Sequence, residues 1–216
     1  VTHWPTGRGF DHFYGFMGGD MSQFAPEIYS GRERVLPRAT RPGGEEPYFM
    51  DADLCDRLIA FMAQHRASAP ERPFFAYLSL GAGHAPHHAP EDLLAKWRGR
   101  FDDGWDAWRE RTHRRQIELG ILPPGTELTP RPSWVPDWAT LDDDERRLAA
   151  RMMEVFAGFL SHTDHELGRF LEFLDRRPQL GHLLLEPLPT QSGERGEPHV
   201  DDLGGLDLRE PEGVRL

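Results

Sequence analysis

The sequence predicts an α/β fold, in which helices pack against a sheet, and three stretches carry that prediction. Residues 51–66 place apolar side chains at three- and four-residue spacing, as in an amphipathic helix. Residues 74–80 form a short apolar run between turn residues, which is typical of a buried strand. Residues 142–175 carry the longest apolar stripe, with acidic residues at its start, where a helix favours negative charge. Helix, strand and helix in this order indicate an α/β layout.

The remaining stretches predict irregular structure. Residues 1–50 are rich in Gly, Pro and aromatic residues without helical periodicity, so we expect loops with packed rings. Residues 91–141 begin like a helix and then contain many prolines, which predicts a long surface excursion. We expect four tryptophans to hold this excursion down: Trp105, Trp108, Trp134 and Trp138. Residues 178–216 lack a sustained period, so we expect a folded domain over residues 1–177 and an irregular Pro/Gly-rich tail after it.

Composition excludes several function classes. The chain has 216 residues and a formal net charge of −11, whereas nucleic-acid binders present a basic face, so we expect no nucleic-acid partner. We also expect no membrane span, because no apolar segment approaches the roughly 20 residues that one needs. The single cysteine, Cys55, can form neither an internal disulfide nor a zinc–thiolate cluster alone. We interpret it as a small buried residue.

The candidate functional residues gather in the loop that follows residues 74–80. His84 comes first in this loop, and ligands in open α/β sheets bind beyond the carboxyl ends of strands. Imidazole also titrates near neutrality, which suits proton transfer. The loop therefore predicts one wall of an active site, although His84 could instead cap its own loop. His87 and His88 are candidates for the substrate rim or for plain solvent exposure. Asp20 could reach the substrate opening or stabilise its turn.

Two metal-site readings remain as alternatives. His84, His87 and His88 could bind a metal together, although catalytic zinc sites usually draw a ligand from elsewhere in the chain. A second group lies within residues 162–166, where His162 and Glu166 are one helical turn apart. The zincin order of ligands is absent there. We therefore expect this second group to be a polar helix flank that bonds to nearby loops.

Several motifs occur in an order that resembles the bacterial arylsulfatases, across residues 4–175. The motifs are Trp4-Pro5-Thr6-Gly7, Gly9-Phe10-Asp11, Phe13-Tyr14-Gly15-Phe16, Gly18-Gly19, Pro73-Phe74-Phe75, Gly83-His84-Ala85-Pro86-His87, Phe101-Asp102-Asp103-Gly104-Trp105, Glu154-Val155-Phe156-Ala157-Gly158-Phe159 and His162-Thr163-Asp164-His165-Glu166. The resemblance implies an alkaline-phosphatase-like α/β/α sandwich and the hydrolysis of sulfate esters, with a small-molecule aryl sulfate as the partner. It further implies a formylglycine nucleophile, made in a Cys/Ser-x-Pro-x-Arg motif, and a calcium ion held by Asp and Asn residues.

Of the family's functional positions, we map only His84 onto this chain. The resemblance implies that His84 contacts the sulfate and protonates the leaving oxygen. Cys55 is not followed by the Pro and Arg of the nucleophile motif, and no Asp-Asn-Gly strand end follows Leu174. We therefore expect an internal fragment of a sulfatase that lacks the nucleophile and binds no calcium by itself. The competing hypotheses are a non-catalytic pseudoenzyme or truncated product, a phosphodiesterase or phosphonate hydrolase of the same superfamily, and a His-rich metal-binding module.

Overall fold

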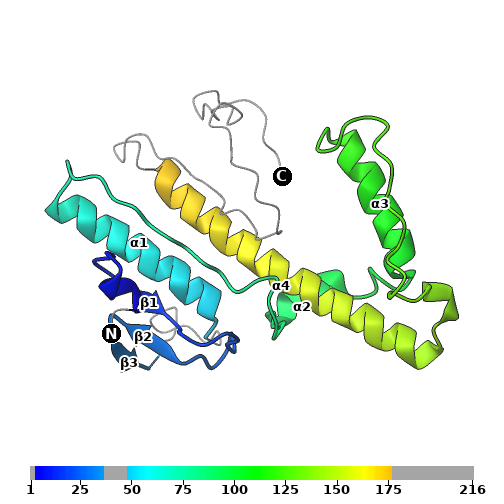
Figure 1. Cartoon of the computed structure of the whole chain (residues 1–216), viewed down its shortest axis with the longest axis horizontal. Helices are drawn as coiled ribbons and strands as arrows, with labels where there is room; N and C mark the ends of the chain where they lie inside the picture. The colour runs from blue at the N-terminus through cyan, green and yellow to red at the C-terminus, as the bar shows by residue number, and fades with distance from the viewer. Residues whose placement is uncertain (1–2, 37–47, 177–216) are drawn as a thin grey trace. The chain divides into compact units, whose positions relative to one another are not determined.

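The computed structural model describes residues 3–36 and 48–176, and Figure 1 labels its elements. Helices and a small sheet occur together, so the mixed α/β class is confirmed at that level. A 3₁₀ turn, η1, spans Pro5–Gly7 near the start. The tail expected over residues 178–216 lies outside the described residues. None of the described helices combines length with the apolarity that crossing a bilayer requires.

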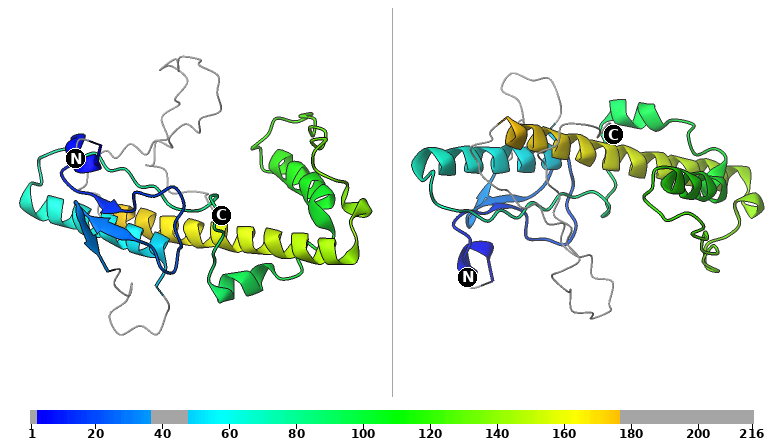
Figure 2. Two further views of the ribbon diagram at one scale, coloured as in Figure 1. Left: turned by 60° about the horizontal axis from the view of Figure 1, so that its bottom comes forward. Right: turned by 90° about the horizontal axis from the view of Figure 1, so that it is seen from above.

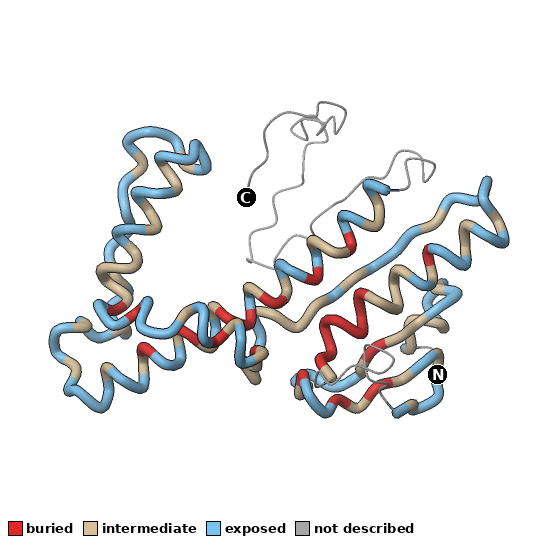
Figure 3. Tube along the Cα trace, turned by 180° about the vertical axis from the view of Figure 1, so that it is seen from behind, coloured by how far each residue is buried: buried red, intermediate tan, exposed pale blue. Residues whose placement is uncertain are grey.

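Helix α1 runs from Met50 to Ser68, in agreement with the helix expected there. Its first turns are buried, as the red part of the tube in Figure 3 shows. Gln23, from a distant loop, caps this end. Its backbone carbonyl accepts a hydrogen bond from the Met50 N–H at 2.8 Å, and its side-chain oxygen accepts one from the Asp51 N–H at 3.2 Å. These bonds satisfy N–H groups that a helix start leaves without intrahelical partners.

Three short strands form an antiparallel sheet against the start of α1, where the sequence had led us to expect only loops. The strands, in sheet order, are β1 (Tyr14–Gly15), β2 (Ile28–Ser30) and β3 (Glu33–Val35). Strands of two or three residues are too short to show an alternating pattern, which explains why they were missed. Ile28 is fully buried and packs with Met50 and Leu54 of α1. The sheet therefore covers one face of the helix start.

Residues 74–80, which we call the open segment, differ from the expected buried strand. They run as a stretched chain beside α1 (Figure 1) but form no sheet ladder with any described residue. Leu78 and Leu80 pack against the core beneath them, whereas Phe75 and Tyr77 are 76% and 54% exposed. The prediction of burial is therefore correct for the face that carries Leu78 and Leu80 and wrong for the face that carries Phe75 and Tyr77. A buried strand also needs hydrogen-bonded neighbours, and the described residues supply none.

Helix α4 spans Asp143–Asp175 and confirms the long helix predicted from the apolar stripe. It begins with a capping box, in which the Asp142 carboxylate accepts from the Glu145 N–H at 2.8 Å and Glu145 accepts from the Asp142 N–H at 2.9 Å. Such reciprocal bonds fix the first turn of a helix. The acidic cluster at its start thus has a defined local role.

Helices α1 and α4 run in the same direction in one layer. The Thr163 hydroxyl of α4 donates to the Asp51 carboxylate at 2.9 Å, and further along both helices Arg169 pairs with Asp56. The second contact lies further toward the C-terminus than the first in both helices, so the two helices run parallel. Figure 2 shows the two helices side by side, with the short strands on one face of their layer.

The excursion over residues 91–141 contains more helix than expected. Helix α2 spans Glu91–Trp97, helix α3 spans Gly104–Glu118, and a 3₁₀ turn, η2, spans Trp138–Thr140. Helix α3 carries charged residues around most of its surface, so no apolar stripe revealed it. Of the four tryptophans expected to hold the excursion down, three pack on rings within the excursion and one does not. Trp105 meets Trp138 with ring centroids 4.8 Å apart and Trp108 packs on Phe101 at 4.7 Å, but Trp134 is 83% exposed.

Gly104 allows this ring packing, and its replacement should destabilise the fold. It has a φ of +82°, and a Cβ added there would lie 2.1 Å from the Trp138 ring. We expect Gly104→Ala to lower the free energy of unfolding by about 1–3 kcal/mol beyond the cost of the left-handed backbone, because the ring must move. Gly120→Ala is the matched control, since φ is +73° there and a Cβ meets nothing within 4 Å. Equal losses for both variants in urea unfolding would contradict this account.

Candidate functional site

The loop over residues 81–90 leaves the open segment next to the start of α1, and one buried carboxylate fixes its first residue. The Gly81 N–H donates to Asp51 Oδ1 at 2.8 Å, and the His84 N–H donates to the Gly81 carbonyl at 3.1 Å, which closes a turn. A Cβ added to Gly81 would lie 2.2 Å from the Gln23 amide nitrogen. Only glycine therefore lets the backbone approach this closely.

Asp51 joins four segments of the chain at this point. Its side chain is fully buried and accepts hydrogen bonds from the Gly81 N–H and the Thr163 hydroxyl. Burial raises the pKa of Asp51, while the hydrogen bonds from Gly81, Thr163 and Gln23 oppose that rise. Gln23 extends the network, because its backbone N–H donates to His88 Nδ1 at 3.3 Å. The loop that carries the histidines is thus tied to α1, to α4 and to the loop around residue 23.

The structure brings together two of the residues singled out from the sequence, His84 and Asp20. His84 Nδ1 lies 3.1 Å from Asp20 Oδ1 and 2.8 Å from the Ala85 carbonyl oxygen. Both neighbours are hydrogen-bond acceptors, so Nδ1 carries a hydrogen and Nε2 is the nitrogen left for a ligand. The two side chains are 69% and 67% exposed. A carboxylate that orients an exposed imidazole is an arrangement suited to general acid–base chemistry.

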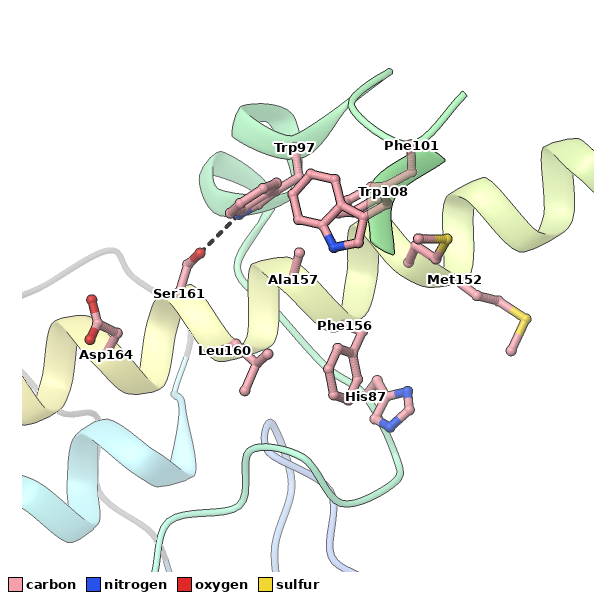
Figure 4. Close-up of a pocket in the computed structure, with 11 residues that line it drawn as sticks. His87, Trp97, Phe101, Trp108, Met152, Phe156, Ala157, Leu160, Ser161 and Asp164 are labelled. Atoms are coloured by element: carbon pink, nitrogen blue, oxygen red, sulfur yellow. Dashed lines mark hydrogen bonds between the residues drawn. The ribbon is translucent and has the colours of Figure 1, made fainter. Parts of the chain in front are cut away.

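His87 and His88 lie in different environments. His87 stands edge-on to Phe156 of α4, with ring centroids 5.0 Å apart, and lines a groove of about 580 Å³. Figure 4 shows this groove along α4, with Trp97 and Trp108 on the other side from His87. His88 instead accepts a hydrogen bond from the Gln23 backbone and packs against Phe24, with ring centroids 5.2 Å apart. A substrate-rim position for His87 and His88 stays a prediction.

Within residues 162–166 of α4, His162 and Glu166 pair along the helix and, through Arg169, with α1, whereas we had expected bonds to nearby loops. His162 and Glu166 are buried, with His162 Nε2 3.8 Å from a Glu166 oxygen. Arg169 pairs with both Glu166 and Asp56. Burial lowers the pKa of His162 to about 4 and raises that of Glu166. His162 Nδ1 finds no hydrogen-bond partner in the part of the chain described here.

Neither metal-site reading gains support from the donor arrangement. Across residues 3–36 and 48–176, no group of three or more His, Cys, Asp or Glu side chains is placed to hold a metal ion. His88 uses Nδ1 within the fold, and His84 Nδ1 is directed to Asp20 and Ala85. The side chains of His84, His87 and His88 thus lie in three different environments and are not grouped as ligands of one metal ion.

Cys55 cannot serve as a nucleophile. It is fully buried within α1, and burial raises the pKa of its thiol to about 12, so it stays protonated near neutral pH. This agrees with the interpretation of Cys55 as a small buried residue.

The Cys/Ser-x-Pro-x-Arg spacing does occur at residues 68–72, which read Ser-Ala-Pro-Glu-Arg, and the sequence reading overlooked it. Ser68 is the last residue of α1, and its hydroxyl donates to the Gln64 carbonyl at 2.9 Å. The His84 loop lies at the other end of α1, beside Asp51. That separation is about 25 Å at 1.5 Å per helical residue. Ser68 is therefore not placed to share a site with His84.

Comparison with known proteins supplies a family for this geometry. A family model described as Sulfatase matches residues 2–185. An arylsulfatase of Klebsiella aerogenes is 28% identical over 173 residues, which cover 79% of this chain and 37% of that protein. An uncharacterized sulfatase of Schizosaccharomyces pombe is 26% identical over 182 residues, which cover 79% of this chain and 32% of that protein. The chain thus spans about a third of the length of these relatives.

Removing the hydrogen-bond acceptors of Asp51 should loosen the loop over residues 81–90. We expect Asp51→Ala to cost about 1–3 kcal/mol in the free energy of unfolding, because no side-chain atom then accepts the hydrogen bonds from the Gly81 N–H and the Thr163 hydroxyl. Amide hydrogen exchange at residues 81–84 should speed up as well. Asp144→Ala is the control, since that carboxylate is 83% exposed and its ion pair with Arg147 lies on the helix surface. Unchanged exchange in the Asp51 variant would mean that another contact holds the loop.

His162 should make the fold sensitive to acid. The pKa of His162 is lowered from 6.5 to about 4, so below pH 6.5 the unfolded chain binds a proton that the folded chain rejects. The stability contribution is therefore present above pH 6.5 and is lost as the pH falls toward 4, by at most about 1.4 kcal/mol per pH unit. His162→Gln should flatten this dependence in thermal melts, and His3→Gln, at an exposed position near the start of the chain, should not. The same slope in all three proteins would refute the assignment.

Proposed function

The chain belongs to the sulfatase family, and from that premise we propose that it forms one wall of the active site of an arylsulfatase-type sulfuric ester hydrolase. Such an enzyme converts a sulfate ester and water into an alcohol or phenol and sulfate. One relative is named an arylsulfatase, which supports an aryl sulfate as the substrate class. Because the chain spans about a third of each relative, the nucleophile is proposed to come from polypeptide outside the described residues.

The observation that carries the proposal is the pairing of Asp20 with His84. The Asp20 carboxylate and the Ala85 carbonyl hold a hydrogen on Nδ1, which leaves Nε2 facing the solvent. In its protonated form His84 would contact a sulfate oxygen and donate the Nε2 proton to the leaving oxygen. As the S–O ester bond breaks, its electron pair stays on that oxygen, which accepts the proton, while the nucleophile's oxygen bonds to sulfur. This proton offsets charge that develops on the leaving group.

The described residues do not fit the calcium ion that the family resemblance implies. Calcium takes six to eight oxygen ligands, mainly from carboxylates and carbonyls. Over the described ranges no cluster of three or more candidate side chains exists, and Asp20 is committed to His84. The proposed proton transfer by His84 therefore involves no metal ion. The proposal places any calcium ligands in the same outside polypeptide as the nucleophile.

A non-catalytic role is the second candidate, and the state of Cys55 favours it for the chain by itself. Cys55 is buried and stays a thiol, and Ser68 lies at the far end of α1 from His84. Neither Cys55 nor Ser68 is thus placed to act as a nucleophile with the Asp20–His84 pair. A pseudoenzyme domain or a truncated product would share that property.

The deciding experiment extends the reading frame. We expect the purified 216-residue chain to show no turnover of 4-nitrophenyl sulfate. The encoding DNA should carry a Cys/Ser-x-Pro-x-Arg motif upstream and an Asp-Asn-Gly motif downstream, and the polypeptide that spans both should hydrolyse the ester. Turnover by the isolated chain after rigorous purification would refute the missing nucleophile. If neither motif lies nearby, the non-catalytic reading replaces the enzyme, and preference for a phosphodiester would indicate the related hydrolases.

In the extended, active polypeptide, His84→Ala should lower kcat by about 10²–10⁴-fold, the usual range for loss of a general acid. Asp20→Asn should lower it less, since the imidazole remains and only its orientation suffers. An ester of a more acidic phenol should restore much of the His84→Ala loss, because its leaving group needs no proton. His165→Ala, an exposed change on α4, serves as the control. A His84 variant with wild-type kcat on all esters would exclude the proton-donor role.

A further inference from the structure

We propose that the groove beside His87 is a binding site for the planar aromatic leaving group of an aryl sulfate, which lies on α4 between two aromatic walls. The inference rests on the proposed function only in identifying the ring as a leaving group. Its physical basis is the size, the ring content and the charge of the groove, which the proton transfer by His84 does not use.

The groove has the size and the lining of a small-molecule site. Its volume of about 580 Å³ lies within the range of about 300–1,000 Å³ that is typical of ligand pockets. An apolar cavity of about 150 Å³ already holds one benzene ring, so a ligand of two fused rings fits. Most of the lining side chains are aromatic, thioether or aliphatic, and the polar ones are His87, Ser161 and Asp164.

One wall of the groove is a group of three packed rings from the excursion. Trp97 stacks on Phe101 with ring centroids 5.7 Å apart and an interplanar angle of 22°, and Trp108 packs on Phe101 at 4.7 Å. The Trp97 Nε1–H donates to the Ser161 hydroxyl oxygen at 2.8 Å, which ties this wall to α4. Phe101 is buried, whereas the two indoles are half-buried. A wall that is already held in place loses little conformational freedom when a ligand binds.

Helix α4 supplies the floor and the opposite wall. Phe156, held edge-on by His87, stands across α4 from the indoles (Figure 4). Ala157 lies between the two walls, where its small side chain leaves room for a ring. Met152 and Leu160 also line the groove and are 59% and 44% exposed. A planar ligand on this floor would meet aromatic side chains at both flanks, and rings attract one another in stacked or edge-to-face geometry.

The charged group at one end of the groove gives the ligand a direction. Figure 4 places the Asp164 carboxylate beyond Ser161, at the end away from His87. Like charges repel, so the sulfate of an aryl sulfate points away from Asp164. His87 belongs to the loop over residues 81–90, and its Cα lies within about 11 Å of the His84 Cα, because three residues span no more than that. The sulfate is therefore directed toward the loop that carries His84.

An aryl group fits the groove better than a polypeptide segment does. Each residue of a polypeptide brings a backbone donor and acceptor that need partners when they are buried. The lining is mostly apolar, and the Ser161 hydroxyl already accepts from Trp97. An aromatic ring needs no such partners. It also gains a quadrupole interaction with the indoles, which a saturated ring of the same size lacks.

The test measures binding of 2-naphthol to the full 216-residue chain by NMR, with decahydro-2-naphthol and inorganic sulfate as comparison probes. We expect a Kd on the order of 1 mM for 2-naphthol, with saturable shifts of the Trp97 and Trp108 indole N–H signals and the Met153 methyl signal. The saturated analogue should bind about threefold more weakly or worse, because it lacks the ring interaction. Inorganic sulfate should leave the indole signals unchanged.

Three variants locate the binding. Met152→Glu should weaken 2-naphthol binding about tenfold or more, because a ring placed over the new carboxylate desolvates it. Ala157→Leu fills the floor without adding charge and should have a similar effect. Leu148→Glu is the matched control, since Leu148 is 64% exposed one helical turn before Met152 and lies outside the groove lining. Thermal melts verify that each variant is folded, and Met152→Glu decides if Ala157→Leu is not.

Three results would overturn the inference: no saturable shift of the indole signals, equal binding of the saturated analogue, or equal losses in the Met152→Glu and Leu148→Glu variants. Loss of 2-naphthol binding in the extended polypeptide would assign the groove to a polypeptide segment instead. An extended polypeptide that fails to hydrolyse 2-naphthyl sulfate, while the 216-residue chain binds 2-naphthol, would refute the proposed function and leave the aromatic site intact. An active polypeptide whose KM for this ester is unaltered by Met152→Glu would refute the leaving-group role.

Discussion

The buried carboxylate of Asp51 is the contact on which the arrangement of this chain depends. It receives the Gly81 N–H at the end of the open segment and the Thr163 hydroxyl from the middle of α4. Its own N–H donates to Gln23, whose backbone in turn holds His88. Burying a carboxylate is costly unless its oxygens are hydrogen-bonded, so these partners must be present together. The loop that carries His84 therefore has the position that this network gives it.

The two long helices could be predicted from the sequence because local signals mark where each begins and ends. The apolar spacing of residues 51–66 and the acidic residues at the start of residues 142–175 are local signals, and the two helices begin and end near these bounds. Helix α3 escaped because its faces are charged almost all round, and the short strands escaped because they hold too few residues to alternate. The open segment was recognised as strand-like, but pairing depends on neighbours that a single stretch of sequence does not reveal.

The candidate site was likewise predictable in part. His84 was singled out from its place after an apolar run, and Asp20 from a glycine turn. Nothing in the spacing of residues 20 and 84 indicated that they meet, because the contact depends on how two loops lie on α1. Gln23 carried no signal at all, since an amide in a loop is ordinary until it caps a distant helix. Ser68 shows the reverse case, in which a motif matches by spacing and lies far from the residues it should serve.

The link between Asp51 and Thr163 joins residues 112 positions apart, which has a consequence for the order of folding. During synthesis the start of α1 emerges long before the hydroxyl that completes its carboxylate network. Closing so long a loop is entropically expensive, and contacts of this range slow folding relative to local ones. Helix α1 and the short strands can form early around Ile28. The carboxylate beneath them stays solvated until α4 arrives, so the histidine loop is consolidated only after residue 163 has been synthesised.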